Sequence, residues 1–271
     1  MQNILSNLHT HSTFCDGKNS PEEVVNKAIE KNFHSLGFSS HGYTSFDLRY
    51  CMQDTEGYIA EINRLKSKYK DKIEIYLGVE EDAFMPVAQE NFDYIIGSCH
   101  YYLVNGVYYP IDSSPAHFQK CLEVFAYDAV AMANAYYPVF CDYIAKRKPD
   151  IIGHFDLITK FDEMGKNSLF LQNAKYNEIA KKYALIAAQS GCLFEVNTGA
   201  ISRGYRTKPY PNEDLLYALK QEDAKLILSS DSHQVEMLDS YFEETKKYLW
   251  DIGFRKIYAL LGGKFQSYSL R

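Results

Sequence analysis

A regular alternation of short apolar segments with longer segments of helical periodicity constrains the fold of this chain more than any other feature. Seven apolar runs are predicted strands, at residues 4–8, 35–38, 73–79, 94–97, 151–153, 193–197 and 226–229. Strands that are separated by helices pair in parallel, because the chain must cross over between them. The pattern therefore predicts an α/β protein with a parallel, barrel-like sheet.

Helix signals fall between these strands. Residues 20–23, Ser-Pro-Glu-Glu, form a capping box with proline at the first helical position, which predicts a helix from about residue 21 to 31. Pro138 is expected to break or kink the helical stretch between residues 114 and 148. Further helices are expected over residues 168–189, from Asn212 onward and over residues 238–252.

The chain is longer than an average domain but lacks a linker. Its 271 residues exceed the ~150 of a typical domain, yet single α/β barrels run to roughly 250. Hydrophobic residues make up 46% and charged residues 24% of the chain, which excludes disordered and low-complexity classes. No tract rich in Gly, Ser or Pro divides the sequence. We therefore expect one domain that spans residues 1–271.

Charge and cysteine usage limit the partners and the compartment. The formal net charge of −6 at pH 7 argues against nucleic-acid binding, which depends on neutralising phosphates with Lys and Arg. The most apolar stretch, residues 126–145, is interrupted by three polar residues and a proline, so we expect no membrane span. The six cysteines form no Cys-x-x-Cys pair, and no secretory signal precedes the first strand. A cytoplasmic protein with reduced thiols is expected.

Histidine and carboxylate side chains gather where the predicted strands end. Six of the eight histidines follow a predicted strand, and three acidic residues share this placement. The nine residues are His9, His11, Asp16, His41, Glu80, His100, His154, Asp231 and His233. Because active sites of parallel α/β folds form at the carboxyl ends of the strands, these side chains are expected to face one opening. His34 and His117 lack acidic neighbours and are expected to be structural.

The spacing and chemistry of these residues indicate a site for several metal ions. His9 and His11, like Asp231 and His233, lie two positions apart, where side chains on a strand share a face and chelate one ion. Imidazole and carboxylate ligands without cysteine suit Zn²⁺, Mn²⁺, Fe²⁺ or Co²⁺ better than Ca²⁺ or Mg²⁺. Nine ligands are too many for one ion. They are about right for three divalent transition-metal ions if one carboxylate bridges two of them.

Short motifs at these positions resemble a known family. They are His9-Thr-His-Ser with Cys15-Asp-Gly, Ser40-His, Gly78-Val-Glu, Gly97-Ser-Cys-His, Gly153-His-Phe-Asp and Ser230-Asp-Ser-His. Together they resemble the motif set of the polymerase and histidinol phosphatase (PHP) superfamily, over nearly the whole chain. The resemblance implies a distorted (β/α)7 barrel of the TIM-barrel type that holds a trinuclear metal site.

Within that superfamily, two segments are informative about the substrate. Residues 93–100 and 150–158 look most like the histidinol-phosphate phosphatases. This resemblance implies metal-dependent hydrolysis of L-histidinol phosphate to L-histidinol and phosphate, a step of histidine biosynthesis. The expected partner is a small phosphorylated substrate, and the sequence does not indicate an oligomeric state.

The resemblance also assigns ligands to ions, position by position. The three sets are His9, His11, Glu80 and Asp231 for the first ion; Glu80, His100 and His154 for the second; and Asp16, His41 and His233 for the third. Glu80 would then bridge the first two ions. Its neighbours Glu81 and Asp82 are expected to be structural or to support the ligands.

Metal chemistry suggests how phosphate would be released. Two ions ~4 Å apart lower the pKa of a bridging water towards ~7, and the resulting hydroxide attacks phosphorus in line with the leaving alcohol. Cations must hold the other phosphoryl oxygens. Arg203 is the best candidate, Lys160 comes next, and Arg206 is an alternative to Arg203. His233 or Asp231 is the candidate proton donor to the leaving group.

Three other functions fit part of this pattern. Another PHP-type phosphoesterase, acting on nucleotides or phosphotyrosine, would use the same ligands. An amidohydrolase barrel also begins with His-x-His, but His100 and the pair Asp231 and His233 stand where that family carries a bridging lysine or glutamate and a lone aspartate. A regulatory metal-binding barrel without activity should have lost ligands, and none is missing here.

Overall fold

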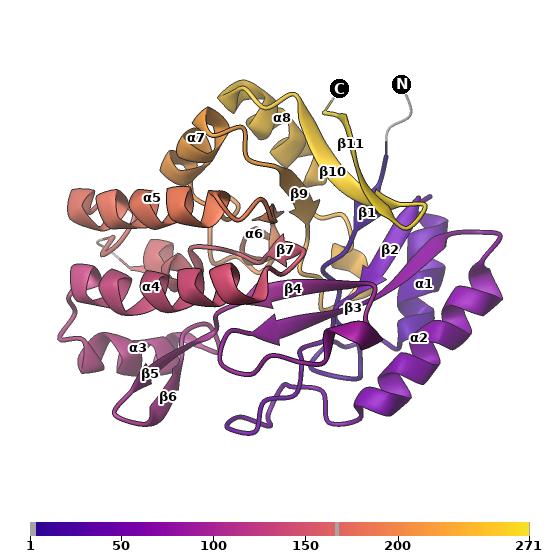
Figure 1. Cartoon of the computed structure of the whole chain (residues 1–271), viewed down its shortest axis with the longest axis horizontal. Helices are drawn as coiled ribbons and strands as arrows, with labels where there is room; N and C mark the ends of the chain where they lie inside the picture. Colours follow the sequence, from indigo (N-terminus) through magenta and orange to yellow (C-terminus); the bar gives the residue numbers. More distant parts are fainter. Residues whose placement is uncertain (1–3, 166–167, 271) are drawn as a thin grey trace.

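A nine-stranded sheet forms the centre of the molecule, in a computed structural model that describes residues 4–165 and 168–270. The strand order is β1-β2-β3-β4-β7-β8-β9-β10-β11 (Figure 1). Their bounds are β1 Ser6–Asn7, β2 Ser35–Phe38, β3 Glu74–Asp82, β4 Tyr94–Ser98, β7 Ile151–Ile152, β8 Leu193–Asn197, β9 Leu226–Ser229, β10 Lys256–Leu261 and β11 Lys264–Ser269. All seven predicted strands are present, and neighbours from β1 to β9 pair in parallel as expected.

The two outer members of the seven-stranded series approach each other at their carboxyl ends. Thr10, just after β1, forms a parallel bridge with Ser232, just after β9. The His11 amide donates to the Ser232 carbonyl over 2.8 Å, and the Ser232 amide donates to the His9 carbonyl over 3.1 Å. No named strand ladder joins β1 to β9 within the described residues. The sheet is thus curved so that its ligand-bearing loops meet, although this single bridge replaces a full closing ladder.

Helices cover the sheet. Their bounds are α1 Pro21–Glu30, α2 Thr55–Tyr69, α3 Pro115–Val124, α4 Ala129–Arg147, α5 Ala174–Ala188, α6 Gly199–Ser202, α7 Glu213–Gln221 and α8 Phe242–Ile252, with the 3₁₀ turns η1 Gln89–Asn91, η2 Leu157–Thr159, η3 Asp162–Met164 and η4 Val235–Met237. Helices α1 and α2 lie together at one side of the molecule, and α3, α4 and α5 stack at the other (Figure 1). Among the described residues, none of the helices combines the length and apolar character that crossing a membrane requires.

The core has two large parts beneath these helix groups and a smaller part made mostly by strand residues. Tyr94 anchors the smaller part, because its hydroxyl donates to the carbonyls of Leu8 and Phe38. The Tyr94 ring lies against Gly78, where a Cβ would come within 2.2 Å of the ring. Gly78 therefore leaves room for the tyrosine that links β4 to the ends of β1 and β2.

Two helix predictions were wrong in detail. The helix expected from residue 168 begins only at Ala174, because the Asn173 side chain caps it and the Asp162 carboxylate accepts the amides of residues 169–171. Pro138 does not break its helix: it lies inside α4. The break falls instead at Ala126 and Tyr127, which both have positive φ. Apolar packing on both sides of Pro138 overrides the proline signal.

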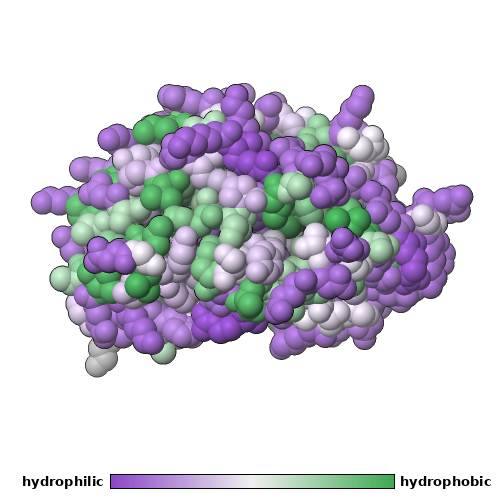
Figure 2. Space-filling model, turned by 60° about the horizontal axis from the view of Figure 1, so that its bottom comes forward, coloured by the Kyte–Doolittle hydropathy of each residue, from purple (hydrophilic) through white to green (hydrophobic). Residues whose placement is uncertain are grey.

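Two hairpins were not predicted. One consists of β10 and β11, which extend the sheet beyond β9. The other consists of β5 Tyr101–Val104 and β6 Val107–Pro110, which pair only with each other. Figure 2 turns the bottom of Figure 1, where this second hairpin lies, towards the reader; apolar residues form separate patches there among polar ones. Exposed apolar side chains on this hairpin include Leu103 and Val107.

Candidate metal centre

The structure brings all nine predicted ligands to the carboxyl ends of the strands. His9 and His11 follow β1, His41 follows β2, and His100 and His154 follow β4 and β7. Asp231 and His233 follow β9, and Asp16 lies in the loop before α1. Glu80 was expected just after its strand. It lies inside β3 instead, because residues 80–82 continue the ladder with residues 96–98 of β4.

Local backbone geometry directs two of the acidic candidate ligands, Asp16 and Asp231, towards the carboxyl ends of the strands. Asp16 lies in a tight turn in which the Gly17 amide donates to the Ser12 carbonyl over 3.1 Å. A Cβ on Gly17 would lie 2.4 Å from the Ser12 nitrogen, so the turn requires glycine. Asp231 has a φ of 49°, a left-handed conformation that is uncommon for residues other than glycine. Such conformations are typical of functional sites.

Glu80 lies at the centre, and its two carboxylate oxygens face different imidazoles. Oε1 is 3.1 Å from Nε2 of His154 and 3.2 Å from Nε2 of His100. Oε2 is 3.1 Å from Nε2 of His9 and 3.0 Å from Nδ1 of His41. The side chain is fully buried, so solvent does not compete for these oxygens. One carboxylate thus separates two groups of ligands, which is the arrangement that a bridging ligand requires.

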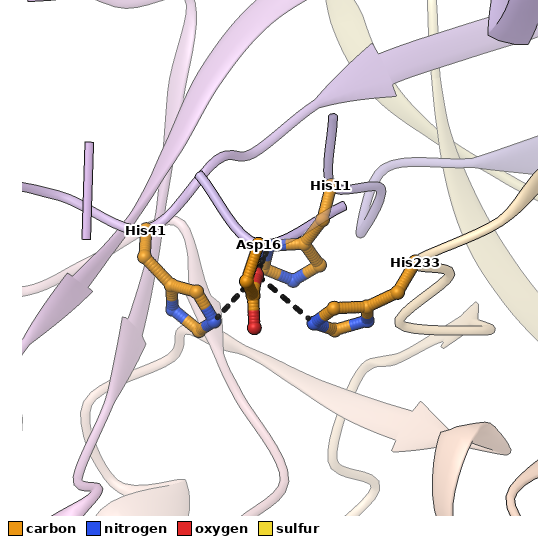
Figure 3. Close-up of side chains that lie close together, drawn as sticks. All are labelled: His11, Asp16, His41 and His233. Carbon is orange, nitrogen blue, oxygen red and sulfur yellow. Dashed lines mark ion pairs between the residues drawn. The ribbon is translucent and has the colours of Figure 1, made fainter. Parts of the chain in front are cut away.

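A second cluster surrounds Asp16. His41 and His233 point at this carboxylate from opposite sides, with His11 behind it (Figure 3). Oδ1 of Asp16 is 3.3 Å from Nε2 of His233, 3.7 Å from Nε2 of His41 and 3.9 Å from Nδ1 of His11. Asp16 is partly exposed and His233 less so, which places this cluster at the mouth of the site. Its four ligand atoms lie within 4.8 Å of one another.

The arrangement of the buried nitrogen and oxygen atoms suits the binding of divalent cations better than hydrogen bonding among the atoms themselves. Nε2 of His9, Nε2 of His11 and Oε2 of Glu80 are buried and make no hydrogen bond, although they lie within 3.1 to 3.5 Å of one another's carboxylate or ring atoms. Orphaned polar atoms of this kind are costly in a folded protein. A cation bound between these atoms would account for their convergence. The three atoms also belong to one group whose mutual distances suit the ligands of a metal ion.

The electrostatics of the centre favour ionised carboxylates. Burial acts to raise the pKa of Glu80, but the surrounding imidazoles outweigh it and hold that pKa well below the usual carboxyl range. Burial acts to lower the pKa of His9, yet Glu195 and Glu80 raise it well above the ordinary imidazole value. For His11, burial and the neighbouring imidazoles both act downward and bring its pKa to about 3. A neutral His11 ring and a charged Glu80 are the forms that bind metal.

Sequence reasoning missed several buried groups that hold the ligands. Glu195 of β8 accepts from Nδ1 of His9 over 2.5 Å. Ser98 donates to Oε1 of Glu80 over 2.7 Å. The only signal for Glu195 was an acidic residue with apolar neighbours on both sides in a predicted strand. That signal does not reveal the partner, which lies 186 positions away.

The two neighbours of Glu80 behave as expected. Asp82 accepts from the His100 main-chain amide over 2.9 Å and lies 3.1 Å from its Nδ1, so it orients that ligand. Glu81 points away and pairs with Arg147 over 2.6 Å. The histidines expected to be structural also lie elsewhere: the Leu5 amide donates to His34, and His117 bonds to the hydroxyls of Ser113 and Ser114.

The three candidate cations are not equivalent. Arg203, just after α6, donates to Oδ2 of Asp231 over 2.8 Å and lines the pocket above the ligands. Lys160 lines the same pocket and donates to the Asp112 carboxylate over 3.1 Å. Arg206 does not line it; this residue is buried and donates to Thr159 over 2.9 Å. The geometry therefore favours Arg203 over Arg206 as the residue nearer the centre.

A second wall of the pocket carries aromatic and acidic side chains. Tyr50 and Tyr101 line it, and their hydroxyls bond to each other. The Tyr50 ring meets the His41 ring edge-on, with 4.9 Å between the ring centroids. Pro110 and Asp112, at the end of the β5–β6 hairpin and just beyond it, complete this wall. The pocket is thus lined by candidate metal ligands and two cations, together with aromatic rings and the Asp112 carboxylate, which pairs with Lys160.

Comparison with known proteins agrees with this geometry. Residues 7–199 match the PHP domain family. A relative from Schizosaccharomyces pombe, named a probable histidinol-phosphatase, is 30% identical and covers 92% of this chain and 87% of its own. The histidinol-phosphatase of Bacillus subtilis is 23% identical and covers 83% of this chain and 92% of its own.

A solved structure shares the fold. It is the histidinol phosphate phosphatase of Lactococcus lactis subsp. lactis, complexed with zinc, L-histidinol and phosphate, and its TM-score is 0.73 at 21% identity. The alignment covers 97% of this chain and 98% of that one. The likeness extends to the curved parallel sheet and the helices around it. With a family match over more than half of its residues and a relative at 30% identity, this chain belongs to the PHP domain family.

Proposed function

We propose that the protein is a metal-dependent phosphomonoesterase that hydrolyses L-histidinol phosphate to L-histidinol and phosphate. The observation that carries the proposal is the position of Glu80, whose two oxygens face separate groups of imidazoles at the base of a pocket. The relatives from Schizosaccharomyces pombe and Bacillus subtilis, both named as histidinol-phosphatases, support the choice of substrate.

The nine predicted ligands are proposed to hold three divalent transition-metal ions such as zinc, manganese or iron. Glu80 would be shared between the ion held with His9, His11 and Asp231 and the ion held with His100 and His154. The third ion would lie at the mouth, among Asp16, His41 and His233. Ions bound by these residues would lower the pKa of water to near neutrality and would neutralise charge on phosphoryl oxygens.

Side chains of the pocket are proposed to bind and orient the phosphate. Arg203 presents a guanidinium beside Asp231, and its Nε atom has no hydrogen-bond partner. Lys160 lies across the pocket and shares its ammonium with Asp112. Both cations line the pocket beside the candidate metal ligands. A planar guanidinium matches the geometry of phosphoryl oxygens well. His233, with 24% of its side chain exposed, is the group proposed to return a proton to the leaving alcohol. Asp231 does not fit this role, because Arg203 and the nearby imidazoles outweigh its burial and hold its pKa well below the usual carboxyl range.

The opposite wall is suited to an amine-bearing, aromatic leaving group. Asp112 is held ionised because Lys160 and nearby imidazoles outweigh its burial and lower its pKa to about 2. Tyr50 and Tyr101 offer ring surfaces beside it. A carboxylate next to aromatic rings complements the ammonium and imidazole of histidinol. A nucleotide or a phosphotyrosine peptide lacks a cation at that position.

The proposal also includes the domain organisation, the partners and the compartment. A single domain over residues 1–271, no nucleic-acid partner and a cytoplasmic location fit this function. The six cysteines are all free thiols, which supports a reducing compartment. The net charge of −6 disfavours nucleic acids.

A substrate panel tests the proposal. Zinc-loaded and manganese-loaded protein is assayed for phosphate release from L-histidinol phosphate, nucleoside monophosphates and a phosphotyrosine peptide, and elemental analysis gives the metal content. We expect two to three ions per chain and the highest kcat/KM for L-histidinol phosphate. A higher kcat/KM for a nucleotide or the phosphopeptide would assign the chain to another phosphoesterase of the family. Fully active protein with one ion or none would refute the trinuclear site.

A further inference from the structure

A buried carboxylate outside the ligand set connects two of the ligands. Glu195 lies in β8, and its side chain is fully inaccessible to solvent. Its Oε1 accepts from Nδ1 of His9 over 2.5 Å. Its Oε2 accepts from the main-chain amide of His154 over 2.8 Å and from Nδ2 of Asn197 over 3.0 Å. One side chain therefore contacts the segments that follow β1 and β7.

We infer that Glu195 is a positioning residue of the metal centre, which fixes the tautomer of His9 and the spacing between His9 and His154. A carboxylate only accepts hydrogen bonds, so Nδ1 of His9 must carry a proton. In the neutral ring that binds metal, the lone pair is then on Nε2, the atom that faces Glu80. The two histidines belong to different ions in the proposed function, on which this inference rests. Glu195 thus keeps the two ion positions at a fixed separation.

The hydrogen-bond partners of Glu195 predict how a glutamine at this position would orient its side-chain amide. The His154 amide is a main-chain donor and cannot change its role. The Asn197 side chain cannot flip either, because its Oδ1 accepts from the Gly199 amide over 2.8 Å. Both donors therefore require an acceptor at the Oε2 position. In Glu195→Gln the amide oxygen must take that place, and its NH₂ group must face His9.

That arrangement reverses the hydrogen bond to His9. An NH₂ group donates, so Nδ1 of His9 becomes the acceptor and the ring proton moves to Nε2. The Nε2 lone pair is then lost to metal binding, although the residue has nearly the same size and shape as before. The effect is confined to the two ions that share Glu80, because Asp16, His41 and His233 have no contact with Glu195 among those that the structure shows.

The experiment measures zinc affinity by chelator competition for the wild type, Glu195→Gln, Glu195→Asp and Glu81→Gln. Glu81 is the matched control, because it is equally buried but pairs with Arg147 away from the ligands. We expect Glu195→Gln to bind the ion held by His9 about 10–100-fold more weakly, with the ion held by Asp16, His41 and His233 unchanged. Glu195→Asp retains acceptors only and should lose less affinity than Glu195→Gln. Glu81→Gln should bind zinc as the wild type does.

Nitrogen NMR of the histidine rings provides a readout apart from activity. Zinc-loaded wild type should show a protonated Nδ1 on His9, whereas Glu195→Gln should show a protonated Nε2. Wild type that binds no zinc would refute the proposed function itself. Wild type with three ions and a Glu195→Gln variant with equal zinc affinity, or with Nδ1 still protonated, would refute only the role of Glu195. Equal losses in the Asp and Gln variants would indicate a packing role and would also overturn the inference.

Discussion

Glu80 shows how much one residue can organise in this protein. It is buried within β3, receives the Ser98 hydroxyl, and divides the imidazoles between its two oxygens. Glu81, the next residue along the same strand, points away and pairs with Arg147. Alternation along a strand places adjacent side chains on opposite faces. Two neighbouring glutamates therefore have different roles for a simple geometric reason.

The exchange Glu80→Gln tests this assignment at the residue scale. The change removes a negative charge and an acceptor from the point that both groups of imidazoles face. We expect kcat to fall by several orders of magnitude while the fold is retained, because a bridging carboxylate holds two ions at once. Steady-state kinetics and circular dichroism of the metal-loaded variant are the measurements. Full activity in Glu80→Gln combined with an inactive Glu81→Gln would show that the other carboxylate is the ligand.

Arg203 gives a second prediction at this scale. Its guanidinium lies at the pocket, held by the carboxylate and carbonyl of Asp231. Arg203→Ala should lower kcat/KM by about 10²-fold, because a cation directed at transition-state charge is typically worth about 3 kcal/mol. Arg64→Ala is the control, because Arg64 is an exposed residue of α2, and it should leave kcat/KM unchanged. Unchanged kcat/KM in Arg203→Ala would remove this residue from the phosphate site.

At the scale of elements, short polar caps decide where the helices begin. Ser20 forms a complete capping box at the start of α1, and Asn173 and Asn212 cap α5 and α7 through their side-chain oxygens. The cap at α1 has a functional consequence, since the loop before it carries Asp16. A helix that begins at a fixed residue gives the ligand loop a fixed length.

Removing this cap should weaken the helix measurably. Ser20→Ala leaves the Glu23 amide without its side-chain acceptor, and we expect the free energy of unfolding to drop by about 1 kcal/mol. Urea denaturation of the metal-loaded protein is the measurement. Ser67→Ala in α2 is the control. The exposed Ser67 hydroxyl only donates to the carbonyl of Asn63, one turn earlier, so its loss should not lower the free energy of unfolding. Equal stability of the Ser20→Ala variant and wild type would contradict the capping assignment.

For the whole molecule, the metal centre connects segments that are far apart in the sequence. The ligands extend from His9 to His233, and the segments after β1 and β9 meet through one bridge between Thr10 and Ser232. Ions bound here would therefore stabilise the closure of the sheet. Ligands that bind only the folded state raise its stability by mass action.

Metal removal should consequently lower the melting temperature, and this decrease in melting temperature should be larger at pH 8 than at pH 6. In metal-free protein the pKa values of His9 and His100 are raised, because Glu195, Glu80 and Asp82 outweigh burial. Protonation of these rings therefore adds stability that is fully present below about pH 6.5 and is lost as the pH rises through the raised values.

The effect has a clear experimental sign. Metal ions bind only the neutral rings, so protons and metal ions compete for them. Metal therefore stabilises the folded protein most at a pH at which the rings of the metal-free protein have lost their protons. His11 acts in the opposite direction, since its lowered pKa favours the neutral ring in the folded state. Melting curves of chelated and zinc-loaded protein at both pH values test the prediction. A larger stabilisation by zinc at pH 6 than at pH 8 would show that proton competition does not govern this site.

Much of this architecture could be predicted from local patterns. Apolar runs predicted the seven parallel strands, a capping box predicted α1, and the residues that follow the strands predicted the ligand set. These features depend on short-range periodicity and on the rule that parallel strands present their carboxyl ends to one side. The chain carries that information within windows of a few residues. No knowledge of tertiary contacts was needed to predict that these side chains would lie close together.

The tertiary structure alone decided which side chains support the ligands and where some elements end. Glu195 meets His9 across 186 positions, and Asp162 delays the start of α5 by capturing three amides. Pro138 remains inside α4 because buried apolar residues pack on both sides of it. These outcomes depend on partners that become neighbours only after folding. A single sequence specifies each residue's chemistry, whereas its partner is fixed by the packing of the whole chain.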